Sequence, residues 1–597
     1  MLLKNYKILL ILGCLLVVSC KEQCEIKYYG HFQKEKELPK KINKNTSGNY
    51  FIDFGKDAFC QINFLFTSDN DNDSVEVWLG EQAVNDSIIK KPIGTKIAER
   101  FILHLKKGTN EYSLNINKKK NYSSASIVMP DSIGEVLPFR YCEIKNYHKK
   151  IKNKDIKRFV VSNIFNEDDS YFESSDTILN QVYKLCKHTM KATSFCGYFV
   201  DGNRERIPYE GDILINQLSW FCVSKDCSIS KRSLRHIIEN PTWPTEYIMQ
   251  TLIIAWQYYL YSGDQSIFTE YYENLKNKTL YMLRDKNGLI PTGDGIRDSM
   301  VLKSVCFKGD FIRDMVDWPK CGDFNWGENS NIIDTTDFGE DDFFIYQKYN
   351  TVENCFHYKA CSLLSKIAQI LGNNKDKQLF EEYAFKTKES INKYLINNNI
   401  YKDGKDTDHK SLHSNMIALY CNVVEEHNLE RVVNYIKSKG MVCSVYGSQF
   451  LLDALCNHNQ EDYALQLLTK TDKRSWYNMI RTGSTLTTEA WDDCYKPNQD
   501  WNHAWGAAPI NIITRKIIGI EPQEPGFKRI KIKPSPYLPD YVTIKVPTIV
   551  GDIFFTHKRK NRNHIITIKV PITSEIQLPN GNMEIVNAGE YNFEYSI

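Results

Sequence analysis

The sequence lacks a marked excess of charge of either sign. Its 76 basic and 73 acidic residues leave a formal net charge of +3 over 597 residues. This near balance gives no electrostatic reason to expect nucleic acid as the main partner. Hydrophobic residues at 42% and charged residues at 25% are ordinary proportions for a globular protein. The composition therefore excludes a mainly disordered chain, a collagen and a coiled coil.

Long apolar runs are missing as well. Beyond the first twenty residues, no stretch approaches the roughly 18 consecutive apolar residues that a membrane helix needs. The apolar segment at residues 8–18 is too short to span a bilayer, and it follows Lys4 and Lys7. A basic start before a short apolar middle is typical of a secretory signal rather than of a structural element.

The end of that segment indicates a lipid anchor. Residues 16–20, Leu-Val-Val-Ser-Cys, resemble a bacterial lipobox, in which the cysteine becomes the lipidated first residue. We therefore expect a lipoprotein signal peptide over 1–20 and lipidation at Cys20. The expected location is the outer membrane, on the cell surface or the periplasmic face. Ordinary cleavage near Ser19, which would release a free protein, is the alternative.

Metal-ligand patterns are absent despite 17 cysteines. Spacings such as Cys222/Cys227 and Cys355/Cys361 are not those of zinc ligand pairs. His409 and His413 would share one face of a helix, but no carboxylate motif completes a site. We expect no metal and no cofactor, and we expect the cysteines to be free buried thiols rather than disulfides.

The hydrophobic pattern divides the chain into three parts after the signal. Over residues 21–167, runs such as 60–66 and 74–79 alternate apolar and polar residues, which predicts an N-terminal β-sandwich. Residues 168–516 show helical periodicity instead. Alternating runs return over 517–597, among prolines that forbid long helices, and predict a C-terminal β-sandwich.

Two helical patterns in the middle part have recognisable ends. Asp176 is a plausible N-cap of the first helix, and Gly372 closes the apolar face that runs from Phe356 to Leu371. Successive helices of this kind can form a solenoid, a bundle or a closed toroid. No repeat of fixed period is present, which argues against a solenoid. We expect a helical toroid between two β-sandwiches.

Two clusters carry the candidate chemistry. Residues 201–212, Asp-Gly-Asn-Arg-Glu-Arg-Ile-Pro-Tyr-Glu-Gly-Asp, place four carboxylates and two guanidiniums in a shaped loop between helices. Residues 485–493 place Glu489 among threonines and Trp491, and residues 500–506 follow with His503. Tryptophan faces and hydroxyl groups suit a sugar. Solvated surface ion pairs and a satisfied helix end are the structural alternatives.

Together the clusters indicate the carboxylate pair that glycoside hydrolysis uses. One carboxyl acts as the acid and must stay protonated, whereas the other activates water or attacks directly. Glu205 lies between Arg204 and Arg206, which would lower its pKa if they approached it. An acid role therefore predicts that both arginines turn away, most simply toward Asp201 and Asp212.

The motifs resemble those of family-78 glycoside hydrolases, the inverting α-L-rhamnosidases of the six-hairpin glycosidase superfamily. The resemblance rests on Arg204-Glu205-Arg206 with Gly211-Asp212, on residues 487–491 and on residues 502–506, in the family's order. Residues 525–530 and 546–551 resemble the family's C-terminal sandwich. The loop between Asp201 and Glu205 is two residues shorter than the family's commonest version.

The resemblance implies a central all-α (α/α)6 barrel and residue roles within it. Glu205 matches the general acid and Glu489 the general base, which inverting enzymes hold about 6.5–9.5 Å apart. The implied partner is a rhamnose-containing oligo- or polysaccharide. The implied activity is removal of α-L-rhamnosyl residues by an inverting mechanism. The residues expected to bind the substrate or to support the acidic network are Asp201, Arg206, Tyr209, Asp212, Trp491 and His503.

Three further residues are weaker candidates for the substrate site. Trp243 and Trp318 lie in acidic and aromatic loops, where they either stack on a sugar or pack in the core. His413 is expected to line the pocket. Near Trp243, Glu246 lies at the start of a predicted helix. Its negative charge would interact favourably with the helix dipole there.

Two other functions stay open at this point. An (α/α)6 polysaccharide lyase needs a Tyr/His base pair and a group that neutralises a uronate, for which Tyr209, His413 and Arg206 are available. A non-catalytic surface glycan-binding protein would use the aromatic residues but leave the paired carboxylates unexplained.

Overall fold

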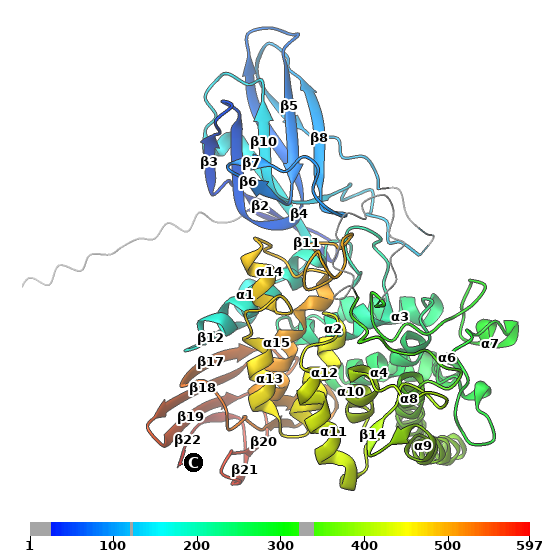
Figure 1. Ribbon diagram of the computed structural model, residues 1–597. Coiled ribbons are helices and arrows are strands. Elements are labelled where there is room, and N and C mark those ends of the chain that lie inside the picture. Colours follow the sequence, from blue (N-terminus) through cyan, green and yellow to red (C-terminus); the bar gives the residue numbers. More distant parts are fainter. Residues whose placement is uncertain (1–24, 120–122, 124, 322–338, 597) are drawn as a thin grey trace, which may run out of the picture.

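The computed structural model describes residues 25–119, 123, 125–321 and 339–596. Within them, a helical core lies between an N-terminal and a C-terminal β-sheet domain (Figure 1). The predicted signal peptide and Cys20 lie outside the described residues. In the described part of the chain, no helix has both the length and the hydropathy for crossing a bilayer.

The N-terminal domain is one nine-stranded sheet with the order β1-β2-β11-β4-β10-β5-β8, and β3 and β9 also pair with β4. The long strand β4 lies in the middle of this order, and β3 and β10 pair with its first half whereas β9 and β11 pair with its second half. The predicted β-rich segment is thereby confirmed, whereas its description as a sandwich stays a prediction. The strands, including the small pair β6–β7, are β1 (Ile26–Tyr29), β2 (Phe32–Glu37), β3 (Lys41–Lys44), β4 (Tyr50–Ser68), β5 (Ser74–Gly80), β6 (Ala83–Val84), β7 (Ser87–Ile88), β8 (Ala98–His104), β9 (Gly108–Ser113), β10 (Leu137–Lys145) and β11 (Ile156–Asn163).

Helices fill the middle of the chain, as predicted. They are α1 (Thr177–Thr193), α2 (Glu210–Phe221), α3 (Ser228–Glu239), α4 (Thr245–Ser262), α5 (Ser266–Glu270), α6 (Tyr272–Lys278), α7 (Ser299–Ser304), α8 (Thr351–Ile370), α9 (Asn374–Tyr394), α10 (Leu412–Tyr420), α11 (Glu426–Lys439), α12 (Gly447–Asn457), α13 (Glu461–Leu468), α14 (Trp476–Arg481) and α15 (Ala508–Ile512), with a short hairpin of β13 (Ile396–Asn397) and β14 (Ile400–Tyr401). Asp176 caps α1, since its carboxylate accepts a hydrogen bond from the Leu179 amide at 2.9 Å. Gly372 follows the end of α8 with φ +74°, a conformation that favours glycine.

The helices form an inner ring with others packed outside it. Each inner helix contacts the next around a closed circuit, in the order α2, α4, α8, α10, α12, α15 and back to α2. Every residue of α2 and α15 is buried, as expected for a helix surrounded by protein. In contrast, α9 and α11 are buried along one stripe and pack on α8 and α10 from outside.

The C-terminal domain contains two sheets, with strand orders β12-β17-β18-β19-β22 and β15-β16-β20-β21. Their strands are β12 (Tyr171–Ser174), β15 (Ile520–Pro522), β16 (Ile530–Ile532), β17 (Tyr541–Val546), β18 (Ile553–Lys560), β19 (Asn563–Val570), β20 (Ser574–Gln577), β21 (Met583–Val586) and β22 (Gly589–Ser596). Strand β12 precedes α1 in the chain, so the segment entering the helical core is already part of the C-terminal sheet.

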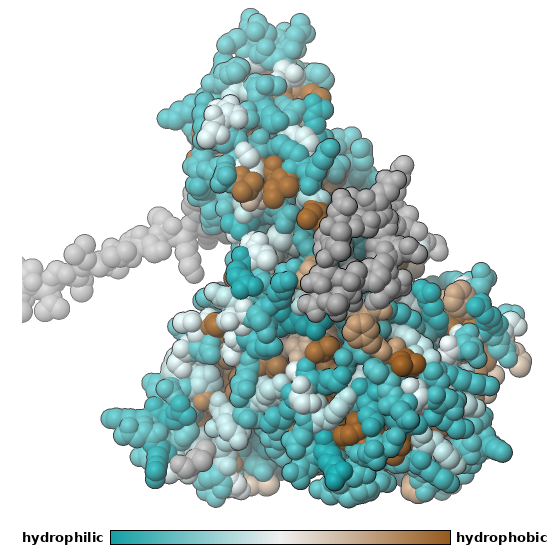
Figure 2. All heavy atoms as spheres, in the orientation of Figure 1, coloured by the Kyte–Doolittle hydropathy of each residue, from teal (hydrophilic) through white to brown (hydrophobic). Residues whose placement is uncertain are grey.

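The surface and the cysteines agree with an ordinary folded protein. Hydrophilic residues cover most of the face in Figure 2, and apolar side chains gather only in small groups. Every cysteine in the described ranges is a free thiol, and most are buried. The expectation of free buried cysteines is therefore confirmed for this part of the chain.

Candidate active site

A cavity of about 270 Å³ collects most of the predicted site residues. The predicted residues that line it are Asp201, Glu205, Tyr209, Asp212, Trp243, Trp318, Glu489 and His503. They come from the loop before α2, from α2 itself, from the loop before α4, from the segment between α7 and α8, and from the segment between α14 and α15. The two sequence clusters therefore meet in space across almost 300 residues of chain. Their catalytic and binding roles stay predictions.

Backbone hydrogen bonds hold the two clusters together. The Asn203 amide donates to the Asn502 side chain at 2.7 Å, and the Arg204 amide donates to the Asp500 carboxylate at 3.0 Å. Gly202 permits this approach, because a Cβ atom there would lie 2.8 Å from the Asp500 carboxylate. The loop that carries Glu205 is thus fixed against the loop that carries Glu489.

The N-terminal domain supports this junction from outside the helical core. The Thr95 hydroxyl donates to the Asp500 carboxylate, and Asn502 donates to Glu81 at 2.9 Å. Lys96, whose side chain is fully buried, pairs with Asp493 at 2.8 Å. Residues of the first domain therefore help to position the second cluster.

Glu489 is a buried carboxylate surrounded by cations. Arg204 donates to both of its oxygens, from Nη1 at 2.8 Å and from Nη2 at 2.9 Å, and Lys496 Nζ lies 3.3 Å away. Burial by itself would raise the pKa of Glu489, but Arg204, Lys496 and His503 outweigh burial and hold that pKa far below its usual range. These cations therefore favour the ionised form of the side chain.

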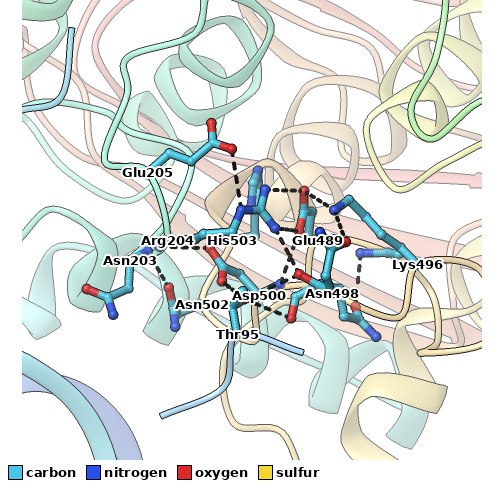
Figure 3. A network of polar contacts seen from close by, with 12 residues as sticks. Thr95, Asn203, Arg204, Glu205, Glu489, Lys496, Asn498, Asp500, Asn502 and His503 are labelled. Carbon is cyan, nitrogen blue, oxygen red and sulfur yellow. Dashed lines mark hydrogen bonds and ion pairs between the residues drawn. The ribbon is translucent and has the colours of Figure 1, made fainter. Parts of the chain in front are cut away.

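Glu205 lies on the other side of Arg204 and is the more exposed carboxylate of the two. Its Oε2 atom accepts a hydrogen bond from the Tyr209 hydroxyl at 2.9 Å, and Arg204 Nε lies 3.4 Å from its Oε1 atom. Figure 3 shows the Arg204 side chain between the two glutamates, with Lys496 beyond Glu489. One guanidinium thus bridges the predicted acid and the predicted base.

The arginines of the first cluster do not pair as the sequence predicted. Arg204 turns to Glu489 rather than to Asp201 or Asp212, and its Nε atom stays 3.4 Å from Glu205. The prediction that both arginines turn away from Glu205 is therefore wrong for Arg204. Arg206 turns to the N-terminal domain, where its Nη1 atom pairs with Glu135 at 2.7 Å. Arg206 has a positive φ of +58°, and it does not line the cavity.

Two further predictions of cavity-lining residues need correction. His413 is fully buried in the core, where its Nε2 atom lies 2.6 Å from the Asp317 carboxylate. Trp491 is buried too, with its indole donating to the Cys443 carbonyl and its ring packed edge-to-face on Trp476. Neither residue lines the cavity, nor does Arg206. The lyase alternative thereby loses two of its three proposed groups.

The acidic residues beside Glu205 are held in distinct ways. Burial raises the pKa of Asp201 well above its usual range, and the neighbouring Glu205 raises it further. Asp212 lies 3.0 Å from His503 Nε2. Burial alone would lower the pKa of His503, but Asp212 and then Glu489 raise it above its ordinary value. The cavity therefore combines an acid whose pKa is raised, an aspartate–histidine pair and a glutamate whose pKa is lowered.

Trp243 and Trp318 form one part of the aromatic lining, and their rings meet edge-to-face with centroids 6.4 Å apart. Both are only half-buried, so they present surface to the cavity rather than pack wholly in the core. Sequence reasoning missed other lining residues, among them Tyr247, Arg313, Met315, Lys496 and Asn498. Lys496 and Asn498 could have been predicted from their position, because they lie between the two motifs of the second cluster.

Glu246 is buried in the core beside the cavity. It has side-chain contacts there in addition to its position at the start of α4. It accepts hydrogen bonds from the amides of Met315 and Val316, and Met315 lines the cavity. Burial, and then the charge of Asp314, raise the pKa of Glu246 to about 8. The folded protein therefore keeps a proton there that an unfolded chain loses near pH 4.3.

This raised pKa predicts a pH-dependent stability. Between about pH 4.5 and 8, unfolding releases the Glu246 proton, so wild-type stability falls as pH rises. Glu246→Gln removes this loss. The free energy of unfolding of the variant, relative to wild type, should therefore rise by about 2–4 kcal/mol from pH 5 to pH 8. Thermal melting at both pH values measures the difference. The exposed Glu382→Gln serves as control, and an equal gain at both pH values would contradict the prediction.

The described residues contain no group of three or more His, Cys, Asp or Glu side chains arranged to hold a metal ion. The cavity lining offers carboxylates, a histidine paired with Asp212, guanidinium and ammonium groups, a tyrosine hydroxyl and aromatic faces. Such a set suits acid/base chemistry on a sugar.

Comparison with known proteins gives a consistent result. Residues 167–517 match the family model described as bacterial α-L-rhamnosidase six-hairpin glycosidase domain, and residues 519–591 match the bacterial α-L-rhamnosidase C-terminal domain. An α-L-rhamnosidase of Formosa agariphila is 24% identical over 361 residues, which cover 57% of this chain and 34% of that protein. One from Alteromonas sp. is 22% identical over 565 residues, covering 86% of this chain and 57% of that protein.

Solved structures share the fold. The α-L-rhamnosidase of Dictyoglumus thermophilum superposes with a TM-score of 0.72 at 19% identity, covering 94% of this chain and 63% of that one. The Streptomyces avermitilis α-L-rhamnosidase, solved with L-rhamnose, gives a TM-score of 0.71 at 15% identity over 95% of this chain and 54% of that one. The chain spans about one third to three fifths of the length of the curated relatives it matches. Because the family model covers more than half of the sequence, this protein belongs to the bacterial α-L-rhamnosidase six-hairpin glycosidase family.

Proposed function

We propose that this protein is a glycoside hydrolase that removes α-L-rhamnosyl residues from a rhamnose-containing glycan with inversion at the anomeric carbon. The observation that carries the proposal is the pair of glutamates in one cavity, with Glu489 held ionised by Arg204 and Lys496. A general base must be unprotonated before the reaction begins, and the lowered pKa of Glu489 favours that state.

Glu205 is the proposed general acid. It lies at the more exposed side of the pair and receives a hydrogen bond from Tyr209. The proton would pass from Glu205 to the glycosidic oxygen while Glu489 takes one from the attacking water. The rings of Trp243 and Trp318 would hold the apolar face of the sugar.

The architecture proposed for this site is an (α/α)6 barrel between two β-sandwiches. The closed circuit of inner helices and the outer helices packed on it support this description. The N-terminal sandwich is supported by one strand, β4, that pairs with strands at both of its ends.

Stereochemistry tests the mechanism directly. Proton NMR of aryl α-L-rhamnoside hydrolysis should detect β-L-rhamnose as the first product, before mutarotation. Glu205→Gln should lower kcat/KM by about 10²–10⁴-fold on substrates with a poor leaving group, and far less on a nitrophenyl rhamnoside, which needs little acid assistance. Initial release of the α-anomer would overturn inversion, and an unsaturated product absorbing in the ultraviolet would indicate a lyase.

We propose in addition that the protein is an exported lipoprotein of the outer membrane, anchored through Cys20. The apolar segment at residues 8–18 and the lipobox-like residues 16–20 support this. Labelling of expressing cells with a fatty-acid analogue should mark wild type and not Cys20→Ser. Label on both proteins, or on neither, would refute the anchor.

A further inference from the structure

Arg313 is a cation in the cavity lining that the proposed mechanism does not use. Its guanidinium lies over the ring of Trp243, with its central carbon 4.6 Å from the ring centroid, and the residue is exposed. Within the described ranges, the guanidinium has no hydrogen-bond or ion-pair partner. Its donors are therefore available to a molecule that enters the cavity.

The other cations of the cavity have anionic partners. Arg204 and Lys496 are occupied by Glu489, and His503 by Asp212. Arg313 differs because it stacks on the aromatic face of Trp243. Such a contact leaves its N–H groups free to donate. A free planar guanidinium at a binding surface matches the bidentate geometry of a carboxylate or a sulfate.

The backbone fixes Arg313 in this place. Its amide donates to the Trp243 carbonyl at 3.1 Å, and its carbonyl accepts from the Thr245 amide at 2.9 Å. The segment is therefore tied to the start of α4, and the stacked side chain has less freedom to lose on binding.

Lys320 is a second cation near Arg313. Burial lowers the pKa of Lys320, Asp341 raises it and the charge of Arg313 lowers it, so the two cations lie near enough to interact.

We propose that Arg313 selects substrates in which the sugar attached to rhamnose carries a carboxylate or a sulfate. This inference rests on the proposed hydrolase function. An unsubstituted rhamnosyl unit bears only hydroxyl groups and a methyl group, so a charged partner for Arg313 belongs to the leaving-group side of the scissile bond. Glu205 would protonate the oxygen that joins the two sugars, while Arg313 holds the acidic substituent of the second.

The test uses the full-length protein and two matched substrate pairs. One pair is a rhamnosyl-glucuronate disaccharide and its methyl ester, and the other is a rhamnosyl-glucoside 6-sulfate and its unsulfated parent. For wild type, we expect the charged member of at least one pair to have the higher kcat/KM. Arg313→Gln should lower the charged-to-neutral ratio for that pair by roughly 10- to 100-fold, as expected when a hydrogen-bonded charge partner is lost.

Salt and a matched variant separate binding from structure. The ratio for wild type should fall as ionic strength rises, because the contact is partly exposed, and the ratio for Arg313→Gln should not. Arg297 is an exposed arginine stacked on Phe311 at 4.5 Å that does not line the cavity, so Arg297→Gln is the control. Arg313→Lys should keep part of the preference.

The outcomes identify the ligand or overturn the inference. A change confined to the glucuronate pair assigns a uronate, and a change confined to the sulfated pair assigns a sulfate ester. Equal losses on charged and neutral substrates, or an unchanged ratio, would overturn the role of Arg313 while leaving the hydrolase intact. If wild type hydrolyses none of the four compounds and no aryl rhamnoside, the proposed function falls, and this inference with it.

Discussion

Glu489→Gln should reduce hydrolysis of an aryl α-L-rhamnoside by at least about 10³-fold, because the amide cannot accept a proton from water. Unlike removal of the acid, this loss should not depend on how good the leaving group is. Steady-state kinetics on a nitrophenyl and an alkyl rhamnoside measure both effects. The result that contradicts the base role is a variant that keeps activity on the activated substrate.

The control for this substitution lies on the same loop. Asp492 is a carboxylate outside the cavity lining, so Asp492→Asn should retain most of the activity. Glu489→Gln is also expected to lower the melting temperature, since it leaves Arg204 and Lys496 without their buried anion. Retention of the folded state at the assay temperature, monitored by circular dichroism, separates loss of chemistry from loss of structure.

Arg204→Met should produce the largest loss of stability among substitutions in the cavity. It removes both hydrogen bonds that the guanidinium donates to Glu489 and leaves the buried carboxylate with Lys496 as its ion-pair partner and the Asp500 amide as a donor. Loss of one partner of a buried pair costs about 3–5 kcal/mol. Thermal or denaturant unfolding measures this cost, and a melting temperature equal to that of wild type would refute the pairing.

The same variant makes a prediction about pH. In wild type the pKa of Glu489 is far below its usual range, so the stability it contributes is present above the unfolded value near 4.3 and is lost only as pH falls. Without Arg204 the pKa of Glu489 rises, and the acidic limb of the kcat/KM profile should move to higher pH. An unmoved limb would show that Arg204 does not control Glu489.

A double-mutant cycle isolates the pair. Arg204→Met combined with Glu489→Gln removes both buried charges, so the double variant should be more stable than the sum of the two single losses implies. The coupling between contacting residues is usually about 0.5–3 kcal/mol. Additive losses would mean that the two side chains act independently.

The order of the β-rich and helical segments was predictable from local sequence patterns. Alternation over 60–66 and helical periodicity over 356–371 reflect which faces of an element are buried, and this information is written along the chain. The cap at Asp176 and the end at Gly372 were predictable for the same reason, because capping depends on a few consecutive residues. The pairing of strand β12 was not predictable in this way, because its partner β17 lies more than 350 residues away.

The sequence by itself determined which residue types form the candidate site and that two distant motifs belong together. It placed Glu205, Glu489 and His503 in those motifs, and the structure brings them to one cavity. Only the tertiary structure decided which charges pair. Arg204 and Arg206 are two residues apart, yet one meets Glu489 and the other meets Glu135 of the N-terminal domain. The physical reason is that an ion pair depends on distance and burial in three dimensions, and a long side chain at a turn can reach partners from several domains.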